Sequence, residues 1–156
     1  MSLHVRAIGG IFILLSSLSL AGTAHANGAT TYASRCSMCH RPDGAGLPGQ
    51  FPRLSGRVAQ VATSNAGRAL LGKILLNGMY GSITVDGKEI NGLMPPMGSM
   101  NDQDISDVLN FVVAMKKAGK LATFTASEIT KLRAAKLSSA AVGTERNGLA
   151  AKGLVP

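Results

Sequence analysis

The chain has 156 residues and a formal net charge of +8, and only 4% of its residues are aromatic, none of them Trp. This length is typical of one domain with terminal extensions and excludes a large multidomain enzyme. So few aromatic side chains form a thin core for a domain of this size. A bound apolar cofactor would fill that deficit.

The N-terminus has the pattern of a secretory signal peptide over residues 1–26. A short stretch with His4 and Arg6 precedes an apolar run at 7–22, and the tripeptide at 24–26 (Ala-His-Ala) has the A-x-A pattern of a cleavage site. An uncleaved membrane anchor is the alternative, but the apolar run is shorter than the roughly 20 residues that a spanning helix needs. We therefore predict cleavage after Ala26, export to an oxidising compartment and no membrane span in the mature chain.

Residues 28–36 are expected to form a short helix that places Gly28, Tyr32 and Cys36 on one face. A small residue one turn before an aromatic residue would let another helix approach closely. An ordinary amphipathic helix with a buried Tyr fits the same pattern and needs no further function.

The stretch Cys36-Ser37-Met38-Cys39-His40 has the C-x-x-C-H spacing of c-type haem attachment. Its two thiols can add to the two vinyl groups of one haem, and the next histidine is then placed against the iron. The same C-x-x-C spacing also serves zinc binding and thiol redox chemistry. In a mature chain whose only histidine is His40, zinc would find at most three of its usual four ligands, and a βαβ pattern around a redox site is missing.

The stretch 41–56 is so rich in Pro and Gly that it must be a loop, and it could lie flat against a haem edge. Within it, the main-chain carbonyl of Pro52 could accept a hydrogen bond from the Nδ1–H of His40. That bond would fix which imidazole nitrogen faces the iron. Alternatively, Pro52 only shapes the turn.

Apolar spacing over residues 58–79 predicts one or two helices, with a break near 65–67 and a stop at Asn77-Gly78. We interpret them as packing elements. Two β-prone runs follow at 83–90 and are joined by Asp86-Gly87, a dipeptide favoured in tight turns. They predict a small two-stranded hairpin.

The irregular segment 91–100 contains Met94, Met97 and Met100. Methionine usually only fills space in a core. On a loop stiffened by Pro95-Pro96, however, a thioether could be held opposite the His40 imidazole, and soft sulfur suits haem iron.

A further helix is predicted to start at Asn101, which is a good cap followed by acidic residues, and to end near Lys117. The remaining residues, 118–156, form a basic C-terminal extension with a short helix from Thr125 or Ser127 to about residue 136. Residues 116–156 have a net charge of +6, whereas 27–115 have about +1. The extension could be a disordered or loosely docked arm, or it could dock on an acidic partner or a membrane face.

Together these features resemble the monohaem class I cytochromes c, in particular the bacterial periplasmic ones that accompany dehydrogenases and terminal oxidases. The resemblance covers about residues 28–117. The matching stretches, in family order, are Gly28-x-x-x-Tyr32, Cys36-Ser37-Met38-Cys39-His40, Pro52-Arg53-Leu54-Ser55-Gly56, residues 85–96 around Met94-Pro95, and the helix with Val108 and Phe111.

The resemblance implies an all-α fold over 27–117 that wraps one covalently bound haem c and carries a small β-hairpin insertion. Its first and last helices would cross, so that Gly28 and Tyr32 meet the face with Val108 and Phe111. The implied site residues are Cys36 and Cys39 for the thioethers, His40 and Met94 as axial ligands, and Pro52, Leu54 and Tyr32 as support of the haem pocket. The sequence departs from the family pattern at Ile90 and Met97, and Met97 and Met100 stay open as alternative ligands.

The function implied by the resemblance is single-electron transfer in the periplasm, with the iron cycling between its ferrous and ferric states. The expected partners are redox proteins with acidic docking surfaces, such as a dehydrogenase, reductase or terminal oxidase, and no nucleic acid. The eight acidic residues include no pair in the loops expected around the haem, which fits a carrier better than a hydrolase. Two alternatives remain: a fixed electron-accepting subunit of a dehydrogenase or reductase complex, and a small haem peroxidase or gas sensor.

Overall fold

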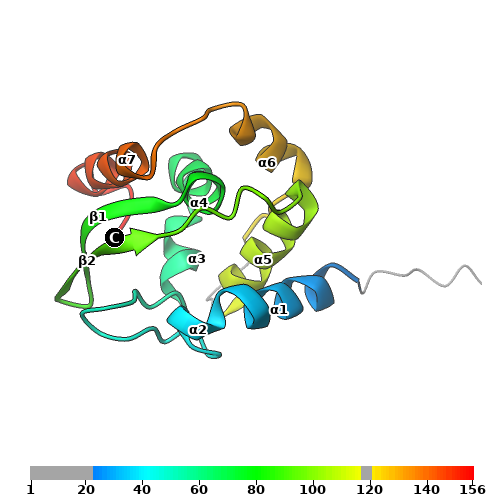
Figure 1. Cartoon of the computed structure of the whole chain (residues 1–156), viewed down its shortest axis with the longest axis horizontal. Coiled ribbons are helices and arrows are strands. Elements are labelled where there is room, and N and C mark those ends of the chain that lie inside the picture. The colour runs from blue at the N-terminus through cyan, green and yellow to red at the C-terminus, as the bar shows by residue number, and fades with distance from the viewer. Residues whose placement is uncertain (1–22, 117–120) are drawn as a thin grey trace, which may run out of the picture.

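The computed structural model describes residues 23–116 and 121–156 and is mostly helical, with one two-stranded antiparallel sheet in these residues (Figure 1). The elements in chain order are α1 (Thr23–Arg35), α2 (Ser37–His40), α3 (Arg57–Val61), α4 (Asn65–Asn77), β1 (Met79–Val85), β2 (Lys88–Met94), α5 (Asp102–Ala114), α6 (Ala126–Arg133) and α7 (Ser139–Ala151). The predicted helical fold with a small hairpin is confirmed. Most of the predicted signal peptide, residues 1–22, lies outside the described residues, and α1 begins before the expected cleavage point.

Helices α1 and α5 cross at a glycine, as the family resemblance implies. A side chain at Gly28 would collide with the main-chain oxygen of Asp107, so only glycine allows the two backbones to come this close. One turn further on, the buried Tyr32 ring contacts the Phe111 ring, with centroids 5.4 Å apart. The crossing therefore fixes the end of α1, from which the C-x-x-C-H stretch continues.

Helices α3 and α4 form where the apolar spacing predicts them, with the break slightly earlier than expected. The interruption lies at residues 62–64 because the side chain of Ser64 caps α4 by accepting a hydrogen bond from the main-chain N–H of Gly67. At the other end, Gly78 adopts a φ of 71° and its N–H donates to Ile74, which ends α4 where predicted.

The hairpin is longer than the predicted 83–90 and runs from Met79 to Met94, which pair with each other at its open end. Asp86 and Gly87 form its turn with φ values of 50° and 73°, the conformation that favours Asp-Gly in tight hairpins. On β1, every second residue from Met79 to Ile83 is less exposed than its neighbours. One face of the hairpin therefore covers the interior.

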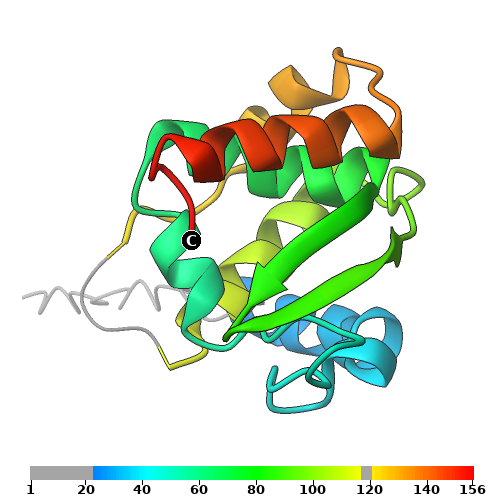
Figure 2. The same ribbon diagram turned by 90° about the vertical axis from the view of Figure 1, so that its left-hand side faces the viewer.

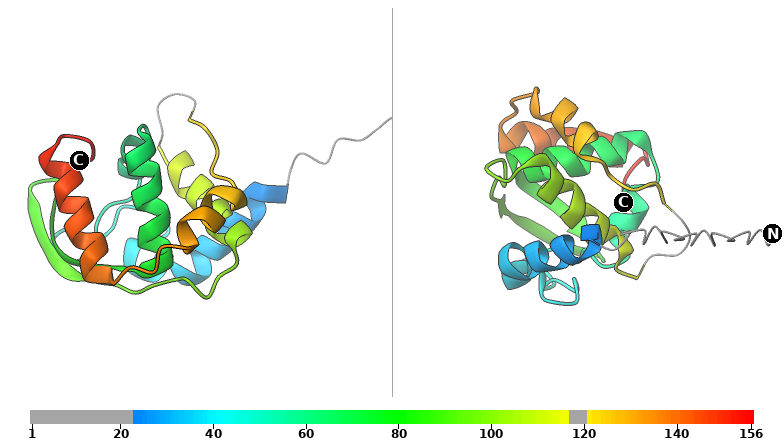
Figure 3. Two further views of the ribbon diagram at one scale, coloured as in Figure 1. Left: turned by 90° about the horizontal axis from the view of Figure 1, so that it is seen from above. Right: turned by 90° about the vertical axis from the view of Figure 1, so that its right-hand side faces the viewer.

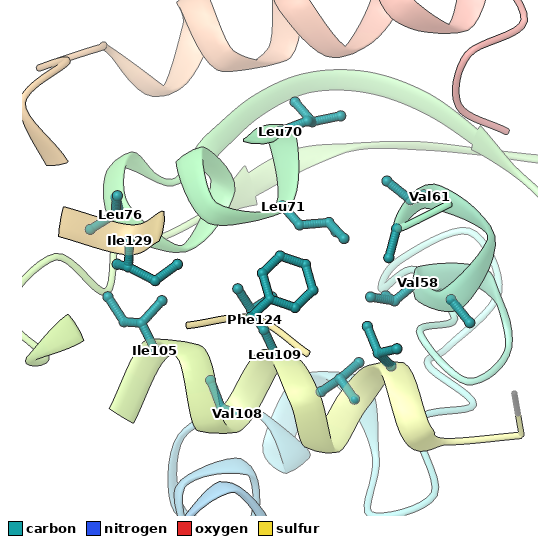
Figure 4. Packing of buried hydrophobic residues seen from close by; sticks show 14 of the residues in the cluster. Val58, Val61, Leu70, Leu71, Leu76, Ile105, Val108, Leu109, Phe124 and Ile129 are labelled. Carbon is teal, nitrogen blue, oxygen red and sulfur yellow. The ribbon is translucent and has the colours of Figure 1, made fainter. Parts of the chain in front are cut away.

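The C-terminal extension is packed on the rest of the molecule, so a disordered or loosely docked arm is wrong for residues 121–156. It buries Phe124, Ile129, Val142 and Val155 in the same core cluster as α3, α4 and α5. Figure 4 shows Phe124 and Ile129 among the core side chains of α4 and α5. Helix α6 begins with a capping box formed by Thr125 and Glu128.

Helix α7 has no counterpart in the sequence prediction. It lies beside α4 and the hairpin, whereas α6 lies beside α4 and α5 (Figures 2 and 3). Gly143 permits its close approach to β1, because a side chain there would collide with the main-chain oxygen of Tyr80. An ion pair between Lys73 and Glu145, at 2.7 Å, joins α7 to α4.

No helix within 23–116 or 121–156 combines the length and the apolar character needed to cross a membrane. The same residues contain no group of three His, Cys, Asp or Glu side chains arranged to hold a metal ion.

Candidate haem-binding site

An apolar cavity lies between the C-x-x-C-H stretch, α3, α4, α5 and the hairpin. Its empty space is about 1030 Å³, including the open mouth. Most of its lining is aliphatic or sulfur-containing, which suits a large, flat apolar ligand. Among the predicted site residues, its walls include Cys36, His40, Pro52, Leu54 and Met94.

His40 enters this cavity from the single turn of α2. Its side chain is only 7% exposed, and its Nδ1 lies 3.0 Å from the main-chain oxygen of Pro52. Burial lowers the pKa of His40, against the opposite effect of that hydrogen bond, so the imidazole is neutral at pH 7. With Nδ1–H donating to Pro52, Nε2 carries the free lone pair that a metal ligand needs.

The loop that presents Pro52 is fixed by its own backbone. Leu47 and Phe51 exchange two main-chain hydrogen bonds of 2.9 and 2.8 Å, and the N–H groups of Leu54 and Ser55 both donate to the Gly44 oxygen. Gly46 is required here because its φ is 67° and a side chain would press against the Pro52 oxygen. The Pro52 carbonyl is thus aimed by a rigid turn.

Tyr32 supports the segment around His40 but does not line the cavity. Its hydroxyl donates a 2.7 Å hydrogen bond to the main-chain oxygen of Arg41, directly after His40. Burial, together with the nearby Cys36 and Asp43, raises the pKa of Tyr32 to about 12. The phenol therefore stays protonated and holds the end of α2 at any physiological pH.

Cys36 and Cys39 are free thiols, both partly exposed. Burial is the main cause that raises the pKa of the Cys36 thiol, and the neighbouring Cys39 adds to it. Of the two, only Cys36 lines the cavity. Met38 between them is 93% exposed, so the pentapeptide turns its two ends inward and its middle outward.

Four methionines contribute to the cavity wall, of which the sequence reasoning considered three. Met94 lies at the end of β2 opposite Met79, and Met97 donates its N–H to the Leu75 oxygen at 2.7 Å. Met100 is buried. All four line the cavity, so position on the wall does not by itself select one sulfur. Met79 was missed because it stands at the end of a helical pattern and its strand pairing with Met94 is not visible in the sequence.

Comparison with known proteins shows the family. Residues 25–116 match the sequence model of a family described as Cytochrome c. The chain is 41% identical over 145 residues to a cytochrome c-552 of Thermus thermophilus, and the match covers 90% of this chain and 95% of that protein. The chain belongs to the cytochrome c family. The predicted resemblance to monohaem class I cytochromes c is thereby confirmed, and so is electron transfer, not catalysis, as its function.

The relatives fall into two kinds, which match different shares of this chain. Residues 1–116 make up less than 90% of the chain, so the match to the cytochrome c-552 must include part of the extension. The cytochrome c subunit of a quinone alcohol dehydrogenase from Gluconacetobacter polyoxogenes is 32% identical over 74% of this chain, and the match covers 24% of that subunit. The gluconate 2-dehydrogenase cytochrome c subunit of Pantoea cypripedii is 30% identical over 68% of this chain, and the match covers 24% of that subunit.

The cytochrome domain implies haem c, and the chemistry of the cavity fits that group. Its apolar walls suit the faces of a porphyrin, and the neutral imidazole of His40 and the methionine sulfurs suit iron. Arg53, Arg57 and Arg146 add three cations to the wall. Arg53 forms an ion pair with Asp86, whereas Arg57 and Arg146 both donate to the main-chain oxygen of Pro156. Burial lowers the pKa of both arginines, and Arg146 lowers that of Arg57 further.

No acidic side chain of the described residues forms an ion pair with Arg57 or Arg146. Haem carries two carboxylates, which suit the guanidinium groups of Arg57 and Arg146. Sequence reasoning missed both arginines. Arg146 belongs to α7, and nothing in its sequence neighbourhood indicates that this helix reaches the cavity.

Proposed function

We propose that this cytochrome transfers single electrons in the periplasm as a monohaem protein. One haem c would be bound through thioethers at Cys36 and Cys39, with His40 and Met94 as the axial ligands of its iron. The observation that carries the proposal is a single apolar cavity lined by both the buried, neutral imidazole of His40 and the side chain of Met94. When bound, the haem supplies an iron that accepts and releases one electron.

The protein's own groups have distinct parts in this proposal. Cys36 and Cys39 would hold the haem through thioethers, each formed by addition of the thiol S–H across one vinyl group, with sulfur on one carbon and the hydrogen on the other. His40 presents Nε2 because its Nδ1–H is engaged by Pro52. A thioether ligand favours the ferrous state and raises the reduction potential, while the aliphatic walls exclude water.

Met94 is preferred over Met97 and Met100 for two reasons. It directly precedes Pro95 in the stretch that resembles the family motif. It also ends β2, so its backbone is fixed by pairing with Met79. A sulfur on a fixed backbone loses less conformational freedom when it binds iron.

The ligand assignment is tested by comparing Met94→Ala with Met97→Ala. The first change should turn the ferric haem high-spin or change its ligand, because the sulfur is lost, whereas the second should leave the spectrum near that of the wild type. Absorption spectra of the ferric proteins, read at the long-wavelength sulfur–iron charge-transfer band, make the measurement. The reverse result would reassign the ligand to Met97.

Redox proteins with acidic docking surfaces are the proposed partners. The net charge of +6 over residues 116–156 would speed encounter with such a surface. Export to the periplasm is proposed from the signal-like sequence of residues 1–26.

A second candidate function is favoured by the dehydrogenase relatives. Two proteins similar to this chain are cytochrome c subunits of an alcohol dehydrogenase and of a gluconate 2-dehydrogenase. The chain would then be a fixed electron-accepting subunit. Purification from the native host distinguishes the two: a stable complex with a large catalytic subunit supports the fixed subunit, and a monomer that reduces an oxidase supports the free carrier.

A further inference from the structure

Arg133, the last residue of α6, connects the C-terminal extension with the loop that carries the methionines. Its Nη1 donates to the main-chain oxygen of Gly98 at 2.6 Å and its Nη2 donates to that of Met100 at 2.8 Å. Its Nε donates to the carboxylate of Asp102 at 2.7 Å. All three guanidinium nitrogens are thus engaged along residues 98–102.

The loop between β2 and α5, residues 95–101, is called the methionine loop here. It is held at three successive points. Its start is fixed by the pairing of Met94 with Met79. Its middle lies on the end of α4, where the Met97 N–H donates to Leu75. Arg133 holds the remaining part. The loop follows a cavity wall to which Met94, Met97 and Met100 all contribute.

Arg133 is itself placed by several contacts. Asp102 also accepts a 2.6 Å hydrogen bond from Thr130, one turn before Arg133 on α6. Ile129 is fully buried, and it packs together with Leu132 against Gly72 of α4. The guanidinium is therefore presented to the loop by a docked helix and is not a mobile surface group.

We propose that Arg133 is a positioning residue of the iron site, which holds the methionine loop against the cavity and so keeps the methionine sulfur on the iron. This inference rests on the proposed function, because it requires a methionine ligand. It assigns the C-terminal extension a part in axial ligation that lies outside the residues of the family match. Loss of Arg133 would free the Gly98 to Asp102 end of the loop and let another ligand displace the sulfur more easily.

The matched control is Arg68, a second guanidinium that docks the extension. It donates to Glu128 and to the main-chain oxygens of Ala122 and Thr123, and it lies over the Phe124 ring. None of these hydrogen bonds goes to the methionine loop. Replacing either arginine by alanine removes three or more hydrogen bonds that its guanidinium donates. Only Arg133 should affect the iron ligand.

The experiment titrates the ferric proteins with imidazole as a competing ligand and follows the sulfur–iron charge-transfer band. Arg133→Ala should bind imidazole about tenfold more tightly than the wild type, because charged hydrogen bonds that hold the loop are lost. Arg68→Ala should bind imidazole like the wild type. Urea unfolding of both variants measures their global stability. If Arg133→Ala does not fold, Arg133→Gln, which keeps one donor group, takes its place.

Wild-type imidazole affinity in the Arg133 variant would overturn the inference, and so would an equal increase in both variants, which would indicate general loosening. A wild-type ferric protein without the sulfur–iron band would instead contradict the proposed methionine ligand itself. The two failures are therefore distinguishable in one set of spectra.

Discussion

The two sides of the cavity are held by different parts of the chain. On the imidazole side, His40 is oriented by Pro52 and supported by Tyr32, all within about one loop and one helix of each other in sequence. On the methionine side, the loop is held by the end of α4 and by Arg133 of the extension. The imidazole side is thus a local structure, whereas the methionine side depends on residues far away in the chain. The family match, which ends at residue 116, contains every residue named on the imidazole side. On the methionine side it contains the end of α4 but not Arg133.

The family domain and the extension each contain one close helix contact made by glycine. Gly28 lets α1 cross α5 inside the family domain, and Gly143 lets α7 approach β1 in the extension. At both positions a side chain would collide with a main-chain oxygen of the neighbouring element, of Asp107 and of Tyr80 respectively.

Alanine at these glycines tests how firmly each region is packed. Gly28→Ala should lower the free energy of unfolding by about 1–3 kcal/mol or more, because two core helices must separate. Gly143→Ala should cost less, since α7 can shift away from β1 without opening the α1–α5 contact. Urea unfolding measures both.

Gly148→Ala is the control within α7, because nothing beyond the neighbouring residues and backbone of α7 itself lies within 4 Å of the added methyl group. It should stabilise the protein by about 0.5–1 kcal/mol through helix propensity alone. If Gly143→Ala behaved like Gly148→Ala, the close docking of α7 on β1 would be wrong.

Acid should weaken the docking of the extension. The pKa of Asp102 is lowered by its hydrogen bond from Thr130, against burial, and further by Arg133. Burial would raise the pKa of Glu128, but the hydrogen bonds from Arg68 and Thr125 outweigh it and lower that pKa as well. Because both carboxyls have lower pKa values folded than unfolded, they stabilise the fold above about pH 4, and this contribution is lost as the pH falls through the folded values.

The acid effect is small, about 0.2–1 kcal/mol for each pair, since both pairs are partly exposed. Urea unfolding at pH 7 and at about pH 3.5 measures the loss in the wild type and in Asp102→Asn/Glu128→Gln. The double variant should lose less stability on acidification. An equal loss in both proteins would show that other carboxyls control the acid response.

Local signals allowed much of the fold to be predicted from the sequence. Asp86-Gly87 set the hairpin turn, because both residues tolerate the positive φ that the turn requires. Asn101 was correctly predicted as a helix start, and Thr125 was one of the two starts considered for the helix that follows, since each cap needs only residues three positions away. The hydrogen bond between His40 and Pro52 was foreseen as one of two options for that proline.

What sequence reasoning missed depends on contacts between distant segments. Helix α7 has little apolar periodicity, with Val142 as its one fully buried side chain, and it docks through the backbone at Gly143. Neither feature can be recognised before β1 is in place. The contacts of Arg133 and Arg146 are invisible for the same reason, and the choice among the methionine sulfurs cannot be made from their spacing.

The most direct test of the account is whether haem stays on the chain after denaturation. The full chain would be made in a host with the c-type maturation machinery, and haem would be stained and quantified after denaturing electrophoresis, with Cys36→Ala/Cys39→Ala as the control. We predict one haem per wild-type chain and no stained band for the control. A colourless wild-type chain, or haem that separates from it in detergent, would contradict covalent attachment at Cys36 and Cys39.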